Sequence, residues 1–139
     1  MGYAVTNIYP GGKMRRLRMH RLLLGVGIGR YPLVDHINGD PLDNRRCNLR
    51  LATETENHWN RRKIRGVSKF KGVRWKKSTT GIGGSWEAQF RAYGKNYTKG
   101  GFKDEILAAK QYDAFAREYA GEFAATNFPI ESAMPKEGV

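Results

Sequence analysis

The stretch VDHINGDPLDNRRCNLRLATETENHWNRR, residues 34–62, decides how the first half of this 139-residue chain is interpreted. Asp35 and His36 stand side by side, asparagines recur after them, and a tryptophan lies just before two arginines near the end. A regular helix or strand does not need this mixture. A site that handles a phosphate group and a metal ion does, because it needs a proton acceptor together with oxygen ligands.

The elements around this stretch are predicted to be a strand, a loop and then a helix. LVDHING reads as a strand that runs into a glycine turn, and the second half of NLRLATETENHWNRRK has helix-forming character. Thr53 is followed three residues later by Glu56, which fits a capping box, so the helix is predicted to begin there. Side chains of a strand alternate between faces, so Asp35 and His36 share a site only at a strand end or bend, which Gly39 permits.

These residue types suit the cleavage of a phosphodiester bond. That reaction needs a nucleophile, neutralisation of the phosphate charge, and a protonated or metal-bound leaving oxygen. A neutral histidine such as His36 can take the proton from a water. An aspartate and an amide oxygen, here Asp35 and Asn57, can hold one hard divalent cation and leave positions for water and phosphate. Taken alone, Asp-His-x-Asn-Gly also fits a turn in which Asp and Asn bond the local backbone.

The composition points to a polyanionic partner. The formal net charge is +12 and the pI is about 10.1, which favours nucleic acid or an anionic membrane surface as the partner. No apolar run approaches the roughly 20 residues needed to span a bilayer, and the first residues do not resemble a signal peptide. The single cysteine, Cys47, excludes a disulfide framework and a cysteine-based zinc finger. We therefore expect a soluble, cytoplasmic protein that binds no membrane.

The chain is predicted to consist of two parts. Residues 1–67 hold 13 Lys and Arg against 5 Asp and Glu, whereas residues 68–139 hold 12 against 8. Between the two parts, RRKIRGVSKFKG at 61–72 is basic and contains Gly and Ser, so it reads as a linker that can also touch phosphate. The first part opens with the strand-like YAVTNIY, the turn PGGK, and MRRLRMHRLLLG, which is either a strand or the start of a helix.

The second part has a clearer pattern. FKGVRWKK, GSWEAQFRAYG and KNYTKGGF indicate three short antiparallel strands, and KDEILAAKQYDAFAREYAGE indicates a helix. Asp104 and Glu105 suit the first turn of that helix, where the helix dipole favours anions, and Gly121 suits its C-terminal cap. The residues predicted to pack this helix on the sheet are Ile106, Ala109, Tyr112, Phe115, Ala116 and Tyr119.

Residues 34–62 resemble the HNH homing-endonuclease family, and MHRLLLG upstream is similar to the lead-in of its phage- and intron-borne branch. The resemblance implies a β-hairpin and a helix that clasp one Mg²⁺ or Mn²⁺ ion, the ββα-metal fold. It also implies roles for four residues: Asp35 and Asn57 as metal ligands, His36 as the general base, and Asn48 as the residue that braces the loop. Asn57 replaces the third letter of the family name and keeps an oxygen ligand, which suits magnesium. His58 is its neighbour, so a shift of one residue in this assignment stays open.

Other residues near this motif carry expectations of their own. Asn44 is predicted to be a turn residue, Asn60 a surface or DNA-facing residue, and Cys47 a small buried hydrophobe. His20 is expected to be a strand histidine bonded to backbone rather than a residue near the phosphate. Trp59 belongs either to the core or to a platform beside DNA. The candidate clamps on the DNA backbone are Arg45, Arg46, Arg61 and Arg62.

Residues 70–129 resemble the Apetala/ethylene-response-factor DNA-binding domain. The marks of that family are KGVRW, the strand WEAQFR, GGF with AAKQYD, and the closing NFP. The resemblance implies a three-stranded sheet packed on one helix, with the sheet lying in the major groove of DNA. The residues expected at DNA are Arg74, Trp75, Lys76, Lys77, Trp86, Gln89 and Arg91.

Two features of this second resemblance leave the base preference open. Gln89 stands where the family usually has an acid, and the loop KKSTTGIGGSW departs from the plant pattern in length and composition. Strand alternation also allows Trp86 and Phe90 to be sheet core, with Glu87, Gln89 and Arg91 on the opposite face.

The predicted fold class is α+β, with a ββα-metal nuclease domain followed by a three-stranded antiparallel sheet on one helix. The predicted domains are a nuclease at 1–64, a linker at 65–69, a DNA-binding domain at 70–129 and a tail at 130–139. The expected function is a metal-dependent endonuclease acting on double-stranded DNA, as a monomer or dimer with no protein partner implied. The alternatives are a non-catalytic DNA-binding regulator with a degenerate nuclease fold, and an RNA-binding or structural basic protein. The target sequence, and nicking versus double-strand cutting, stay open.

Overall fold

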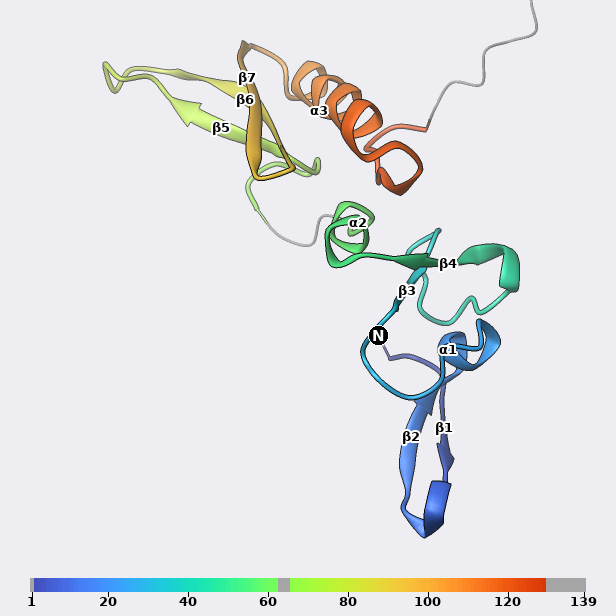
Figure 1. Cartoon of the computed structure of the whole chain (residues 1–139). Helices are drawn as coiled ribbons and strands as arrows, with labels where there is room; N and C mark the ends of the chain where they lie inside the picture. Colours follow the sequence, from blue (N-terminus) through green and yellow to red (C-terminus); the bar gives the residue numbers. More distant parts are fainter. Residues whose placement is uncertain (1, 63–65, 130–139) are drawn as a thin grey trace, which may run out of the picture. The chain divides into compact units, whose positions relative to one another are not determined.

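A computed structural model describes residues 2–62 and 66–129 of the chain (Figure 1). The chain divides into two compact units, Met1–Arg62 and Lys63–Val139, which are called unit 1 and unit 2 below. Residue 65 of the predicted linker and the predicted tail at 130–139 lie outside the described residues. Within the described part of the chain, no helix has the length and apolar character needed to cross a membrane.

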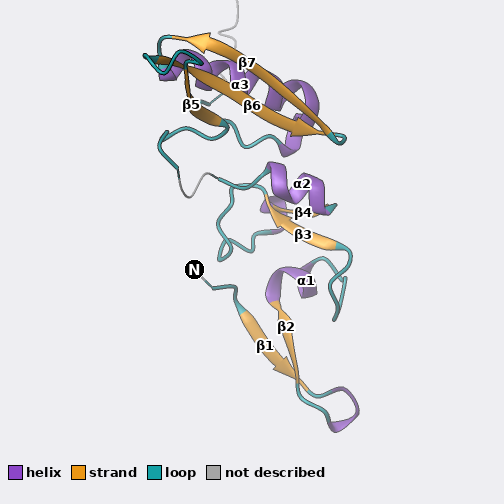
Figure 2. Cartoon of the chain, turned by 90° about the vertical axis from the view of Figure 1, so that its left-hand side faces the viewer, coloured by secondary structure: helices purple, strands orange, loops and turns teal. Residues whose placement is uncertain are grey.

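Unit 1 is built from two antiparallel hairpins, each followed by a short helix (Figures 1 and 2). In the first, β1 (Val5–Ile8) pairs with β2 (Arg15–Arg18), and α1 (Met19–Leu23) follows directly. In the second, β3 (Leu33–His36) pairs with β4 (Leu49–Ala52), and α2 (Glu54–Trp59) follows. MRRLRMHRLLLG is therefore a strand that continues into a helix.

The start of α2 confirms the predicted capping box. The Thr53 hydroxyl accepts a hydrogen bond from the Glu56 backbone N–H at 3.2 Å, and Glu56 Oε2 accepts one from the Thr53 N–H at 2.7 Å. Each side chain thus satisfies a backbone donor that has no partner inside the helix. At the other end of α2, Trp59 is 7% exposed and belongs to the core, which decides between its two predicted roles.

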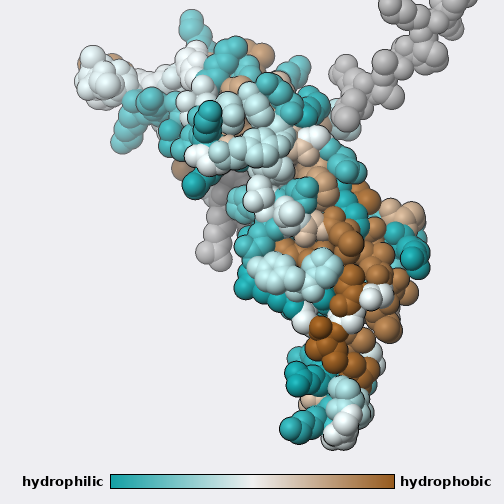
Figure 3. All heavy atoms as spheres, viewed as in Figure 1, coloured by the Kyte–Doolittle hydropathy of each residue, from teal (hydrophilic) through white to brown (hydrophobic). Residues whose placement is uncertain are grey.

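The loop between α1 and β3 is organised by one buried side chain, Arg21. Its guanidinium donates to the carbonyl oxygens of Gly27 at 3.0 Å and Pro32 at 2.6 Å. Longer bonds of 3.2–3.4 Å run to the carbonyls of Val26, Arg30 and Tyr31. The loop backbone therefore wraps around a single cation. Beside it, Figure 3 shows apolar side chains gathered on the surface around α1, where Met19, Leu22 and Leu23 are exposed.

Unit 2 contains the three predicted strands and the predicted helix. The sheet has the order β5 (Val73–Lys77), β6 (Gly84–Ala92), β7 (Lys95–Phe102), and α3 (Glu105–Ala120) covers one of its faces (Figure 2). The Asp104 carboxylate caps α3 by accepting from the Ile106 N–H at 2.8 Å, and Gly121 ends it with a φ of 54°. The C-terminal cap is as predicted, whereas Asp104, predicted in the first turn, is the N-cap and the helix begins at Glu105.

The buried face of α3 differs from the prediction at one position. Ala109, Tyr112 and Ala116 are buried as expected, whereas Ile106 is 42% exposed. At 100° per residue, Ile106 lies about a quarter turn from the line through Tyr112 and Ala116 that meets the sheet. Small residues, Ala108 and Ala120 among them, fill the buried stripe instead.

The last two residues of the predicted linker, Ser68 and Lys69, are bonded to neighbours within unit 2, whereas Val67 is 91% exposed. Ser68 is 2% exposed, and its Oγ accepts a hydrogen bond from the Phe70 N–H at 3.0 Å. The Lys69 N–H donates to Glu105 Oε1 at 3.2 Å, and the Phe70 ring lies 5.3 Å from that of Phe128. The serine turn and the aromatic anchor together make this basic segment part of the fold.

A buried carboxylate links the YD and NFP motifs of unit 2. Asp113 is 1% exposed, and it accepts from the Asn127 N–H at 2.7 Å and the Phe128 N–H at 2.9 Å. The Asn127 side chain in turn bonds both backbone groups of Lys71, at 2.6 and 3.1 Å. This cluster ties the segment after α3 to the segment before β5.

Candidate functional site

Asp35 and His36 end β3, and both are 5% exposed. Asp35 lies opposite Arg50 in the register of β3 and β4, and its Oδ2 accepts from Arg50 Nε at 3.0 Å and Nη2 at 2.9 Å. Such a fork holds the carboxylate in one orientation and compensates its charge away from water. The two side chains have different neighbours, because the Asp35 carboxylate contacts Arg50 and Asn60 whereas the His36 ring contacts His20, Tyr3 and Asn44.

Asn60 lies directly behind this pair, which corrects its prediction as a surface or DNA-facing residue. It is 9% exposed, and its Nδ2 donates to both Asp35 oxygens, at 3.1 and 3.0 Å, and to the His36 carbonyl at 2.8 Å. The residue follows α2, whose end returns the chain to β3. The polar run around Asn60 hides this role in the sequence, because nothing local indicates a partner 25 residues away.

Asn48 ties together the loop that follows His36. Its Oδ1 accepts from the Asn38 N–H at 3.0 Å, and its Nδ2 donates to the Asp43 carbonyl at 2.8 Å. Within this loop Asn44 Oδ1 lies 3.3 Å from His36 Nε2, so Asn44 contacts the histidine as well as forming a turn. Cys47, predicted to be buried, is exposed because Asn48 takes the buried position beside it.

His20 packs against His36, contrary to its prediction as a strand residue bonded to backbone. It lies on α1 and is 3% exposed, and its ring meets the His36 ring edge-on with centroids 5.0 Å apart. Tyr3 contacts the His20 ring at 5.0 Å and the His36 ring at 6.0 Å. Burial, followed by the nearby charges of His36, Arg18 and Arg21, lowers the pKa of His20 to about 4. No sequence pattern links His20 or Tyr3 to His36.

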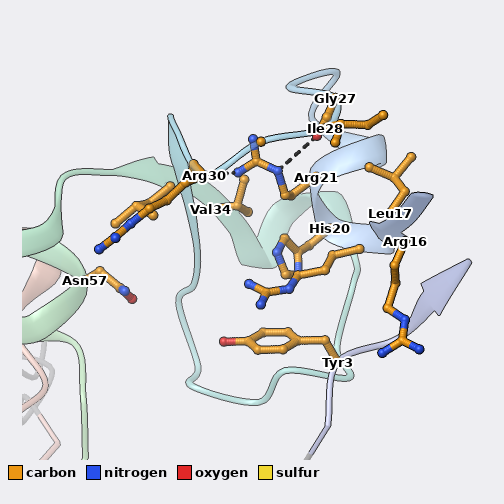
Figure 4. A pocket seen from close by; sticks show the side chains of 13 residues that line it. Tyr3, Arg16, Leu17, His20, Arg21, Gly27, Ile28, Arg30, Val34 and Asn57 are labelled. Atoms are coloured by element: carbon orange, nitrogen blue, oxygen red, sulfur yellow. Dashed lines mark hydrogen bonds between the residues drawn. The ribbon is translucent and has the colours of Figure 1, made fainter. Parts of the chain in front are cut away.

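Asn57, rather than His58, faces a cavity of about 530 Å³ in unit 1 (Figure 4). His20 and Tyr3 also line this cavity, and His58 is exposed on α2. The cavity therefore connects the predicted second metal ligand with the histidine that packs on His36.

The oxygen donors present fit one hard divalent cation in kind. Among the described residues, Asn60 is the one donor to Asp35 Oδ1, so this oxygen can accept a further bond. Asn57 offers an amide oxygen as a second ligand. Across residues 2–62 and 66–129, no group of three or more His, Cys, Asp or Glu side chains is arranged to hold a metal. An ion held by Asp35 and Asn57 would therefore take its remaining ligands from water or phosphate. Asn57 lines the cavity, and Asp35 is not among the residues that line it.

The predicted clamp arginines differ in how firmly they are held. Arg45 is paired with Asp43 through two bonds of 2.8 and 2.7 Å, and this pairing lowers the pKa of Asp43 to about 2. Arg46 donates to the Leu23 carbonyl at 3.4 Å and Arg62 to the Asn38 carbonyl at 3.1 Å. Arg61 is exposed.

In unit 2, strand alternation divides the predicted DNA-binding residues between two faces. Arg74 and Lys76 of β5 share the face away from α3 with Gln89 and Arg91 of β6. Trp75, Lys77 and Trp86 belong to the other face. There the Trp75 and Trp86 rings meet edge-on at 5.2 Å, and Trp86 packs against the core cluster, which favours its role in the sheet core.

The open face of this sheet also holds a buried acid, Glu87. It is 5% exposed, and its Oε1 accepts from Arg74 Nε at 2.8 Å and Nη2 at 2.5 Å. Lys76 Nζ lies 3.4 Å from its Oε2. The hydrogen bonds from Arg74, with the charges of Arg74 and Lys76, hold the pKa of Glu87 below its usual value. The Arg74 side chain is therefore oriented while it stays 56% exposed.

Comparison with known proteins identifies the class of unit 1. The sequence model of the HNH endonuclease family matches residues 20–59, from His20 to Trp59. This match confirms the HNH part of the sequence resemblance. No solved structure matches the chain.

Two viral proteins resemble the chain. An uncharacterized HNH endonuclease of Acanthamoeba polyphaga mimivirus is 35% identical over 133 residues, which cover 91% of this chain and 63% of the relative. The chain thus spans less than two thirds of that relative's length. Protein 3.8 of Escherichia phage T7 is 33% identical over 92 residues, which cover 66% of this chain and 72% of the relative. The chain therefore contains a region, residues 20–59, that matches the HNH endonuclease family, and one of these relatives carries that name.

Proposed function

We propose that the chain is a metal-dependent endonuclease that hydrolyses phosphodiester bonds of double-stranded DNA. The observation that carries this proposal is the pair Asp35 and His36, which the HNH domain holds buried at a strand end, each fixed by other side chains. The net charge of +12 supports a polyanionic substrate. Without His36, the pairing of Asp35 with Arg50 would be explained by a structural role alone. His36 beside it adds a group that can accept a proton.

His36 is the proposed general base. Asn44 Oδ1 faces its Nε2 at 3.3 Å. With Nε2 donating to that amide oxygen, Nδ1 is the nitrogen left to accept the proton of an attacking water. Asn48 supports this arrangement indirectly, because it ties down the loop that carries Asn44.

Asp35 and Asn57 are the proposed residues that hold one Mg²⁺ or Mn²⁺ ion. Such an ion supplies charge neutralisation at the phosphate and at the leaving oxygen. The Arg50 fork and Asn60 set the orientation of the Asp35 carboxylate before any ion binds. Orientation of a ligand by hydrogen bonds from its neighbours is a general feature of metal sites.

Unit 2 is the proposed DNA-reading part. Its open face presents Arg74, Lys76, Gln89 and Arg91, a donor-rich set suited to base edges and phosphates. A second binding part on the same chain makes the encounter of the nuclease part with DNA effectively intramolecular. Site preference and residence time would then come from unit 2.

The test is cleavage of supercoiled plasmid with Mg²⁺ or Mn²⁺, and with a chelator as the metal-free control. His36→Ala is expected to lower the nicking rate by about 10²–10⁴-fold, the usual contribution of a general base, with DNA binding retained. His58→Ala is the matched control, because His58 is an exposed histidine of the same unit. Equal nicking by His36→Ala and wild type would contradict the proposal. If the wild type does not nick, the same protein is given a randomised DNA library, where selective binding without cutting would favour the regulator.

A further inference from the structure

The cavity shown in Figure 4 is strongly basic. Its walls come from the N-terminal segment, β2, α1, β3 with the loop before it, and α2. The described residues that line it include four arginines: Arg16, Arg18, Arg21 and Arg30. None of the described lining residues is acidic. A volume of about 530 Å³ lies within the range of sites that bind small molecules or parts of larger ligands.

Two of these arginines already have bonding partners within the protein. Arg21 bonds the loop carbonyls, and Arg30 is paired with Glu54. For Arg16 and Arg18, no partner carboxylate occurs among the described residues, and the Arg18 guanidinium lies 4.8 Å from the centre of the Tyr3 ring. Alternation along β2 puts both side chains on one face. Two positive charges thus line the cavity without a compensating anion.

The His20 side chain is the second unusual feature of the cavity wall. It is 3% exposed, and within the described residues its Nδ1 is a buried atom with no hydrogen-bond partner. Native proteins rarely leave a buried polar atom unpaired. The low pKa of about 4 keeps this imidazole neutral at physiological pH, so it can donate a hydrogen bond without adding charge. Because Nδ1 has no exposed surface, donation to a ligand requires the ring to turn within the wall.

We propose that this cavity binds a phosphodiester group of the DNA strand, next to the one that is cleaved. Arg16 and Arg18 neutralise its charge, and His20 donates a hydrogen bond to one of its oxygens. The contact between the His20 and His36 rings and the position of Asn57 on the wall join this subsite to the nuclease site. The inference rests on the proposed nuclease function, since it takes DNA as the ligand.

The test follows the side-chain nitrogen resonances of His20 by NMR in the full-length, ¹⁵N-labelled protein. A short DNA duplex is added in the presence of a chelator, so that binding is observed without cleavage. The His20 resonances are expected to shift on addition of the duplex. The shift should disappear in the Arg16→Gln/Arg18→Gln double variant and persist in Arg15→Gln, which removes one charge from the same strand but does not line the cavity.

Binding measured against salt gives an independent readout. If both arginines contact phosphate, the slope of log K against log salt should fall by about two units in the double variant. His20→Gln keeps a neutral donor and should retain most of the affinity, whereas His20→Ala should lose part of it. Each variant should give the NMR spectrum of a folded protein, so that a loss of DNA affinity can be assigned to the subsite and not to unfolding.

Unchanged His20 resonances, while fluorescence anisotropy shows the duplex bound, would overturn the inference. So would a response to inorganic phosphate without a response to the duplex. The outcomes also separate the two proposals. A His20 response in a protein that binds the randomised library selectively, but cuts neither the library nor the plasmid, supports the phosphate-binding cavity and contradicts the nuclease. Nicking with unchanged His20 resonances contradicts the subsite alone.

Discussion

The two units bury different kinds of side chain. In unit 1 the described buried apolar residues are few: Leu17, Leu49, Ala52 and Trp59. Polar and charged side chains make up the rest of its interior: His20, Arg21, Asp35, His36, Asn48 and Asn60. In unit 2 the interior is mainly alanine and aromatic: Val73, Ala88, Phe90, Ala92, Ala108, Ala109, Tyr112, Ala116 and Ala120.

This difference shows how each unit is stabilised and where function can be placed. Directional bonds hold unit 1, so its interior can carry the charged groups that chemistry needs. Contact between close-packed apolar side chains holds the sheet and helix of unit 2 together, and its buried polar groups, Ser68, Glu87 and Asp113, lie outside this apolar set. We therefore place the proposed function of unit 2 on an outer face. Removing one partner of a buried hydrogen bond or ion pair should therefore destabilise unit 1. Changing the volume of a buried side chain should destabilise unit 2.

The largest effect is expected from Arg50→Gln in unit 1. The change leaves the buried Asp35 carboxylate without its cation, and breaking a buried pair in this way costs about 3–5 kcal/mol. Hydrogen exchange of the β3 and β4 amides measures this loss, with the amides of α3 as the internal control. In the double variant Asp35→Asn/Arg50→Gln, part of the stability should return. Equal exchange in Arg50→Gln and wild type would show that the pair does not stabilise the unit.

The next effect tests packing in unit 2. In Gly72→Ala the new methyl carbon would lie 1.9 Å from Tyr112 Cδ2 and 2.8 Å from the Gln89 carbonyl oxygen. We expect a loss of about 2–3 kcal/mol in the free energy of unfolding of unit 2, measured by urea denaturation. Gly94→Ala is the control, because its φ of 76° is similar but no atom lies within 4 Å of the new carbon. Its loss should be about 1 kcal/mol, and equal losses would contradict the packing explanation.

A smaller effect concerns the outer face of unit 2. Glu87→Gln removes the charge that holds Arg74, so Arg74 should gain freedom and the face should gain net positive charge. We expect tighter binding to random DNA and a specificity ratio about tenfold lower, measured by competition between selected and random duplexes. Glu118→Gln makes the same change of charge on an exposed position of α3. An unchanged ratio in Glu87→Gln would remove Arg74 from the proposed base-reading residues.

The smallest effect concerns the cap of α2. Thr53→Ala should cost unit 1 about 1 kcal/mol, the usual value of an N-cap. Hydrogen bonds from Thr53 lower the pKa of Glu56 from its usual 4.5. The Glu56 carboxylate therefore stabilises unit 1 above that pKa, and this stability is lost as the pH falls through the lower folded-state value. Thr53→Ala removes the hydroxyl but keeps the Thr53 N–H, so the thermal unfolding of unit 1 should depend only slightly less on acid pH. An unchanged melting temperature at neutral pH would contradict the capping role.

Local patterns predicted the elements better than the site. The cap at Thr53, the C-terminal cap of α3 and the strand end at Asp35 follow from spacing within a few residues, which the sequence displays directly. Asn60 was missed because its partners lie on another strand.

His20 and Arg50 belong to the same kind of case. His20 reaches His36 only when α1 packs beside β3, and Arg50 meets Asp35 only through the register of the hairpin. Hydrophobic periodicity carries no information about such pairs, because they are polar and far apart along the chain. Ile106 shows the limit of periodicity itself, since a helix can face its sheet with small residues and leave a larger one outside.

The guanidinium of Arg21 has a consequence for how this loop can vary among related chains. It bonds five main-chain carbonyls between Val26 and Pro32 and none of their side chains. Every residue type supplies a carbonyl, so substitutions in this loop preserve the bonds that shape it, except at Gly27 and Gly29, whose φ values of 59° and 132° favour glycine. Its length is far less tolerant, because an inserted residue would move carbonyls beyond the reach of one side chain. In relatives that retain this arginine, we expect residue substitutions in the loop to be common, and insertions or deletions to be rare.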